Sequence, residues 1–222
     1  MRIVGGDGFG GVATIPLALM LLAPSQVAAQ STSPAATPPN SASTVVTGAK
    51  VLAGAALGLA IHESGHVALD LAFKANPGVR KVSFAGMPFF AITHDPVSDG
   101  REFAISSVGF WMQHASSEML LIRRPNLRHE RAPVAKGLLA FNTLTALMYA
   151  GAAVARTGPS ERDTRGMAVT TRIAEPWIAP VILGPAALDA ARYFKPESRV
   201  LRWSSRAAKL GGLLLMARAV GH

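Results

Sequence analysis

The feature that most constrains this chain is a long apolar stretch, residues 45–73, which carries His62, Glu63 and His66. No proline occurs between positions 44 and 76, so one continuous helix is predicted. A spacing of four residues brings His62 and His66 to the same helix face, where both rings can be directed at one point. Glu63 lies about 100° around the helix from His62, within reach of a water at that point.

This arrangement is the His-Glu-x-x-His pattern of zinc hydrolases, in which the two histidines bind the metal and the glutamate acts as general base. Ionisable groups inside a membrane-length apolar helix are costly, and such groups usually serve a function. We therefore expect His62 and His66 to be zinc ligands and Glu63 to be the catalytic residue. The alternative interpretation is a polar packing motif, in which one histidine hydrogen-bonds to a neighbouring helix.

The composition favours a membrane protein. Half of the 222 residues are hydrophobic, 16% are charged and the mean hydropathy is +0.30, which is more apolar than an ordinary soluble domain. The net charge of +9 comes from basic residues spread over the hydrophilic connections, a pattern that favours contacts with membrane lipid over nucleic acid. Because the chain has no cysteine, a transition-metal site must use histidine and carboxylate ligands.

The N-terminal part differs in composition from the rest of the chain. Residues 1–29 have the apolar core and the small residues before a cleavage point that are typical of a signal peptide; an uncleaved N-terminal anchor is the alternative. Residues 30–43 are rich in Ser, Thr, Pro and Ala, which predicts a disordered linker. The remaining residues, 44–222, are predicted to form one membrane-embedded domain.

Three further apolar stretches follow the site helix, at residues 103–122, 136–154 and 176–194. We therefore predict an all-α membrane protein, a bundle of about four transmembrane helices. A short β-hairpin is predicted directly after the site helix, within residues 79–93. A fifth apolar stretch, residues 210–220, is short and is expected to lie at the interface or to span partly.

Two details of these stretches lead to further expectations. Pro180 and Pro185 are expected to kink or interrupt the fourth stretch. The segment 123–136 carries five basic residues against Glu130, so the positive-inside rule favours a cytoplasmic location for it.

A catalytic zinc site needs a third protein ligand. Asp189 is the first choice, because it is a lone carboxylate within an apolar stretch. Glu118 is the second and would complete a His-His-Glu set. Asp70 lies on the site helix itself, where a hydrogen bond to His66 suits it better than ligation. The alternative for Asp189 is an ion pair with Arg192, three residues further along a helix.

The zinc motif inside an apolar helix resembles that of the site-2 proteases, the intramembrane zinc metalloproteases. Gly65 matches the small residue that this family has before the second histidine, and the segment 79–93, with Gly86-Met87-Pro88, is similar to the family's hairpin. The segment from Gly184 to Asp189 is similar to the family's later helix bearing Leu-Asp-Gly, although Ala190 stands in place of the glycine.

The resemblance implies a membrane-embedded zinc metalloendopeptidase that hydrolyses peptide bonds of transmembrane or membrane-associated protein substrates. It implies zinc held by His62, His66 and Asp189, with Glu63 as the base. We expect an integral protein of the bacterial inner (cytoplasmic) membrane. The competing function is a non-catalytic membrane scaffold or a degenerate protease. Three polar residues are expected either to bind the substrate backbone or to pack between helices: Gln113, His114 and Asn142.

Overall fold

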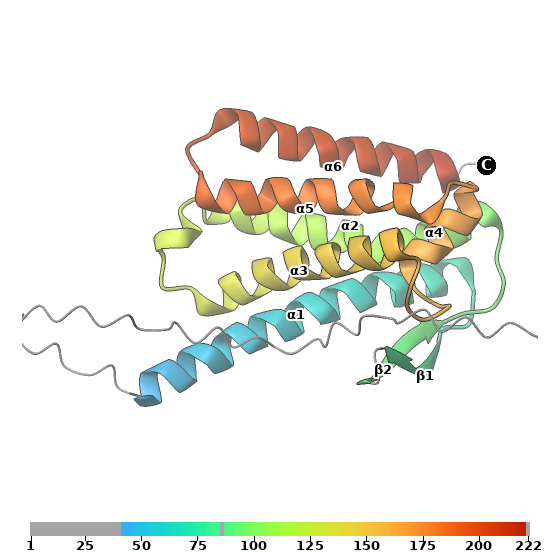
Figure 1. Ribbon diagram of the computed structural model, residues 1–222, viewed down its shortest axis with the longest axis horizontal. Helices are drawn as coiled ribbons and strands as arrows, with labels where there is room; N and C mark the ends of the chain where they lie inside the picture. The colour runs from blue at the N-terminus through green and yellow to red at the C-terminus, as the bar shows by residue number, and fades with distance from the viewer. Residues whose placement is uncertain (1–40, 85–86, 221–222) are drawn as a thin grey trace, which may run out of the picture.

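The computed structural model describes residues 41–84 and 87–220 (Figure 1). The predicted signal peptide or anchor, residues 1–29, lies outside the described residues. So does most of the predicted linker, residues 30–43, whose last three residues belong to the first helix.

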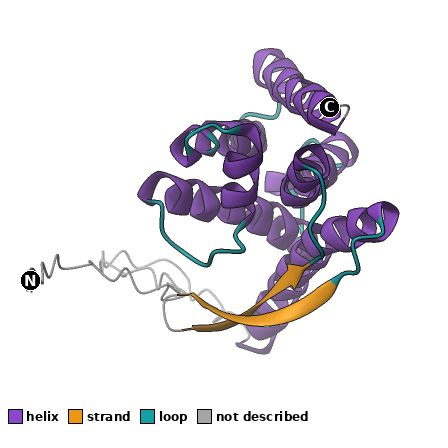
Figure 2. Ribbon diagram, turned by 90° about the vertical axis from the view of Figure 1, so that its right-hand side faces the viewer, coloured by secondary structure: helices purple, strands orange, loops and turns teal. Residues whose placement is uncertain are grey.

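Within the described residues the chain is mostly helical, with one small antiparallel sheet. The helices are α1 (Ser41–Phe73), α2 (Asp99–Arg123), α3 (Pro133–Ala155), α4 (Asp163–Thr171), α5 (Ala179–Phe194) and α6 (Arg199–Val220). Two 3-10 turns join them, η1 (Leu127–His129) and η2 (Glu175–Trp177), and the strands are β1 (Gly78–Phe84) and β2 (Met87–Thr93). Figures 1 and 2 show the long helices lying side by side, with the hairpin and α4 at the same end of the bundle.

The site helix and the hairpin follow the sequence pattern closely. Helix α1 is continuous and ends at Phe73, where the apolar pattern stops. The two strands pair in a register that places Val79 opposite Ile92. These elements are confirmed because each is specified by a local period and by the turn residues that follow it.

The predicted bundle of about four transmembrane helices is not confirmed. Among the described helices, two are long and apolar enough to cross a membrane, one over Ser43–Phe73 in α1 and the other α3. By length and composition alone, these two favour an association with a membrane. Helices α2, α5 and α6 carry more charge or are shorter, and α2 buries many polar side chains inside the molecule.

Three other elements differ from the expectation. The segment 156–175, expected to be a polar connection, contains the short helix α4. Pro180 lies in the first turn of α5, where a missing N–H costs nothing, and α5 continues through Pro185. Helix α6 begins at Arg199, well before the apolar stretch of residues 210–220 that the sequence analysis singled out.

Helices α1 and α3 cross at very short range, because each places a glycine at the contact. A Cβ atom on Gly54 would lie 2.0 Å from the carbonyl oxygen of Val134, and one on Gly137 would lie 2.0 Å from the carbonyl oxygen of Val51. Both contacts are with backbone, which cannot rotate away as a side chain can. Small residues at such crossings allow close packing of helices in membranes.

Substitution of Gly137 by alanine should therefore push the two helices apart. We expect Gly137→Ala to lower the free energy of unfolding by about 1–3 kcal/mol, the usual cost of overpacking. The matched control is Gly151→Ala on the same helix, where an added Cβ meets nothing within 4 Å. Thermal unfolding of the purified protein in detergent measures both; equal melting temperatures would contradict the tight crossing.

Candidate metal centre

Three polar side chains converge at the end of the bundle near the hairpin: His62 and His66 from α1, and Asp163 from the start of α4. The Nε2 atoms of the two histidines are 3.2 Å apart. Asp163 Oδ2 lies 3.0 Å from His62 Nε2 and 3.6 Å from His66 Nε2. The histidines are 3% and 6% exposed, so the group is buried and can hold a metal ion.

The spacing of these atoms fits one tetrahedral ion. Zinc binds histidine nitrogen and carboxylate oxygen at about 2.0–2.1 Å, so two ligands of a tetrahedral site lie about 3.3–3.4 Å apart. The three observed separations lie on both sides of that value. Two imidazoles and one carboxylate are also the protein ligands of many catalytic zinc sites, which leave a fourth position open.

The ring of His62 is fixed by close packing on several sides. It contacts the rings of Phe110 at 5.5 Å and Tyr149 at 6.1 Å between centroids. Gly109 lies against it so closely that a Cβ there would be 2.5 Å from the imidazole. Helices α2 and α3 therefore hold the first ligand in place, although neither supplies a ligand itself.

Asp163 is held from both sides along the chain. Arg162 donates two hydrogen bonds to Glu175, at 2.7 and 2.6 Å, and Thr164 donates one at 2.8 Å. Burial raises the pKa of Glu175, but these hydrogen bonds outweigh burial and hold the pKa below its ordinary value. We call these contacts of Arg162 and Thr164 with Glu175 the clamp on Asp163. The clamp is fully present when the pH is above the ordinary pKa of a glutamate, and it is lost as the pH falls through the lowered pKa of Glu175.

The charge of Asp163 suits metal binding. Burial raises its pKa, yet the attraction of His66 and the hydrogen bond with His62 outweigh burial and hold the pKa well below its usual range. Asp163 is therefore ionised at neutral pH and offers an anionic oxygen.

The structure does not bring Asp189, the expected third ligand, to the two histidines. Its Oδ1 atom accepts hydrogen bonds from Ser205 and Lys209, both at 2.7 Å, and from Arg192 at 3.3 Å. The ion pair with Arg192 is the alternative that the sequence left open. Glu118 belongs to the same ion cluster, where it also contacts Arg192 and Lys209.

Asp70 lies one turn beyond His66 and is fully buried. Neither of its carboxylate oxygens has a hydrogen-bond partner among the described residues. The expected hydrogen bond between Asp70 and His66 is therefore not formed, and Asp70 interacts with His66 and His94 only electrostatically.

The other polar residues singled out in the sequence lie away from the three ligands. Asn142 donates hydrogen bonds to the backbone oxygen of Gln113 and to the hydroxyls of Ser116 and Ser117, and so ties α3 to α2. His114 packs against the ring of Trp111 at 5.4 Å. Glu63, in contrast, interacts electrostatically with both histidines and Asp163.

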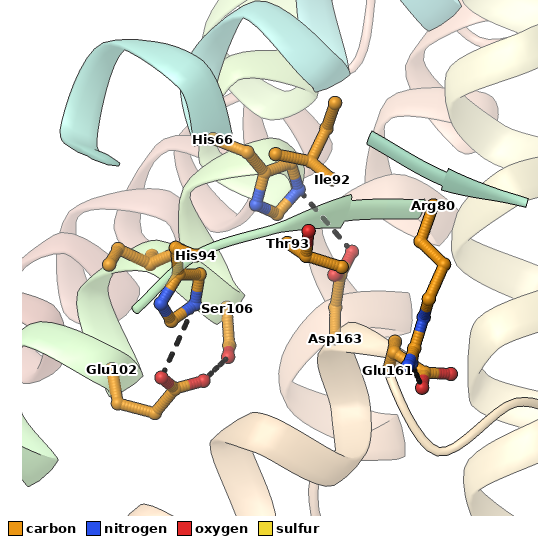
Figure 3. Close-up of a pocket in the computed structure, with 10 residues that line it drawn as sticks. His66, Arg80, Ile92, Thr93, His94, Glu102, Ser106, Glu161 and Asp163 are labelled. Atoms are coloured by element: carbon orange, nitrogen blue, oxygen red, sulfur yellow. Dashed lines mark hydrogen bonds and ion pairs between the residues drawn. The ribbon is translucent and has the colours of Figure 1, made fainter. Parts of the chain in front are cut away.

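A pocket of about 330 Å³ opens beside His66 and Asp163. Figure 3 shows Ile92 and Thr93 of β2 on one side of it, and the ion pair of Arg80 with Glu161 on another. His94 Nε2 lies 3.3 Å from Glu102, which also accepts a hydrogen bond from Ser106. His66 and Asp163 thus face a space that is lined by both polar and apolar side chains.

Sequence reasoning missed Asp163. It follows a polar segment containing Gly158, Pro159 and Glu161 and opens a helix of 9 residues, so it reads as an acidic residue in the first turn of a short helix. The only available signal was an acidic residue at a helix N-terminus, which surface helices also show.

Removal of single carboxylates tests the ligand set. We expect Asp163→Ala to lose the bound metal, because two histidines alone bind zinc weakly, and Asp189→Ala to keep it. Metal content of the detergent-purified proteins after dialysis measures both, with His66→Ala as the reference for an empty site. Loss of metal in Asp189→Ala and retention in Asp163→Ala would show that Asp189, and not Asp163, is the third ligand.

The clamp on Asp163 can be tested in the same assay. Glu175→Ala releases Arg162 and Thr164, and we expect zinc affinity to fall about 10–100-fold, as for other residues that orient a ligand. Glu130→Ala is the control, since Glu130 also pairs with an arginine, Arg124, in a different loop. Equal affinities for the two variants would show that the clamp does not position the ligand.

Comparisons with known proteins do not assign the chain to a family. No protein-family model matches the chain, and no curated protein or solved structure matches it significantly. The interpretation of the site therefore depends on its geometry and on the chemistry of its side chains.

Proposed function

We propose that this protein is a membrane-embedded zinc metalloendopeptidase. The observation that carries the proposal is the set of two buried imidazoles and one ionised carboxylate, spaced for a single tetrahedral ion. Such a set with an open fourth position is typical of zinc hydrolases rather than of structural zinc sites, which use four protein ligands. The resemblance of the His-Glu-x-x-His helix to the site-2 proteases points to the same chemistry.

The site residues have separate roles in the proposed peptide hydrolysis. His62, His66 and Asp163 would hold zinc, which supplies a water of lowered pKa and polarises a peptide carbonyl. Glu63 is near enough to all three ligands to interact with them electrostatically, without being one of the group. Its carboxylate accepts the proton of the attacking water and passes it to the leaving amine.

The pocket and the hairpin favour an extended peptide as the substrate. Ile92 and Thr93 of β2 line the pocket beside His66. Among the described strands, β1 and β2 pair with each other, and an extended peptide can add to the edge of such a sheet through backbone hydrogen bonds. Helical peptide carbonyls are already bonded, so the substrate must be unwound locally to reach the ligands.

The membrane setting of the proposal is supported by α1 and α3, the two described helices that are long and apolar enough to cross a membrane. The ligand histidines lie on one of them, so the substrates we propose are transmembrane or membrane-associated proteins. The proposed location is the bacterial inner membrane, with lipid as the surroundings of the bundle.

The competing function is a membrane scaffold, in which Asp163 simply pairs with the histidines and joins α4 to α1. Metal content separates the two functions, because a scaffold gains nothing from zinc. A bound metal stabilises the folded state by mass action, by about 2.7 kcal/mol at a hundredfold excess over the dissociation constant. A chelator should then lower the melting temperature of the protein but not that of His66→Ala.

Glu63→Gln tests the catalytic step itself. We expect this variant to keep its zinc and to lose peptide hydrolysis by about 10²–10⁴-fold, because the amide cannot accept a proton. The assay is cleavage of a membrane-anchored reporter in vesicles, with metal content measured on the same sample. Ser64→Ala, next on the helix and exposed, is the control that should retain activity. Undiminished cleavage by Glu63→Gln would remove Glu63 from the mechanism.

A further inference from the structure

Helix α6 turns its polar side inward. Ser205 and Lys209 are buried against the bundle, with Lys209 only 6% exposed. One turn further, Gly212 lies against the ring of Trp111, where a Cβ would be 1.8 Å from the nearest ring carbon. In Figures 1 and 2, α6 lies on the side of the bundle opposite α1.

The outer side of α6 is apolar. Leu210, the residue next to Lys209, is 61% exposed. Alternating spacings of three and four residues place several exposed apolar side chains on one stripe of a helix: Val200, Trp203, Ala207, Leu210 and Leu214. This is the reverse of a surface helix in a soluble protein, whose charged side faces water.

The inward charges of α6 are paired with carboxylates of two other helices. Glu118 of α2 accepts hydrogen bonds from Arg206 at 2.9 Å and from Lys209 at 2.7 Å. Asp189 of α5 accepts hydrogen bonds from Lys209 and Ser205, and Arg192 contacts both carboxylates. Three cations thus share two carboxylates: Arg192 and Lys209 are buried, and Arg206 is partly exposed beside Trp203.

We infer that the outer face of α6 lies against the hydrocarbon of a lipid bilayer. Its 22 residues extend about 33 Å along the helix axis, close to the roughly 30 Å thickness of a bilayer core. By composition alone α6 is too charged for a membrane-spanning helix, but composition does not give the direction in which each charge faces. In α6 the middle charges face inward, which is how membrane proteins accommodate ionisable residues.

Lipid explains the exposed apolar surface better than a second copy of the chain does. Large apolar side chains are also exposed on α1 and α3, among them Leu52, Leu57, Leu144 and Leu147. Because α1 and α6 lie on opposite sides of the bundle, one partner protein would cover only one of these faces. A surrounding bilayer covers all of them.

The exposed tryptophans agree with a bilayer around the bundle. Trp203 lies near the start of α6, and Trp177 lies in the turn before α5, at the other end of the bundle. Both are largely exposed. Tryptophan is enriched at the two interfaces of a membrane. The two tryptophans therefore lie near the expected boundaries of the hydrocarbon layer.

This inference rests on the membrane setting of the proposed function but not on peptide hydrolysis. The chain has no cysteine, so single cysteines can be introduced and labelled cleanly. We would attach bimane to Leu210→Cys on α6, to Leu57→Cys on α1, to Leu144→Cys on α3, and to the exposed loop position Thr157→Cys. The labelled proteins are reconstituted in vesicles of lipids with or without bromine on the acyl chains, since bromine quenches bimane on contact.

We expect the label at position 210 to be quenched to the same extent as those at 57 and 144, while the label at 157 keeps its fluorescence. Quenching at 57 and 144 but not at 210 would overturn the inference and leave the membrane setting intact. Quenching at none of the three would overturn both.

The same Leu210→Cys protein, unlabelled, tests the two other surroundings of this face. Rapid reaction with a membrane-impermeant maleimide in sealed vesicles would place the face in water. Efficient disulfide-linked dimers under mild oxidation would assign the face to a second copy of the chain. Either result overturns the inference, and protection from both supports it.

Discussion

Two imidazoles on one turn of an apolar helix need a polar partner, and the fold depends on supplying it. His62 and His66 are almost completely buried, and Asp163 is the carboxylate that meets both. The short helix α4, its clamp through Glu175 and the packing of Gly109 under the ring of His62 all position this one contact. The pocket and the proposed base Glu63 then lie beside it.

Charge burial is handled in the same way at the other side of the molecule. Glu118 and Asp189 lie inside the bundle with Arg192, Arg206 and Lys209. A buried carboxylate is costly unless opposite charge and hydrogen bonds surround it. These two buried polar clusters differ in surroundings: the histidine cluster borders a pocket, and the other holds α6 to α2 and α5.

Local features of the fold could be predicted from the sequence, and long-range pairings could not. The end of α1 at Phe73, the shared face of the histidines and the hairpin depend on residues near one another in the chain. Asp163 is 101 residues from His62, and no period or spacing links the two. Asp189 was expected to bind zinc or to pair with Arg192; it pairs with Arg192 and also with Lys209, which lies just before the apolar stretch predicted from residues 210–220.

The separation between His62 and Asp163 gives the site a mechanical role. An ion shared by these residues would tie together points 101 residues apart in a chain without cysteine. Unlike a disulfide, such an ion would bind the folded chain alone, so its effect on stability would depend on the concentration of free metal. The ion would then act as a reversible cross-link between α1 and α4, added to the packing of Met167 and Ala168 of α4 in the hydrophobic core.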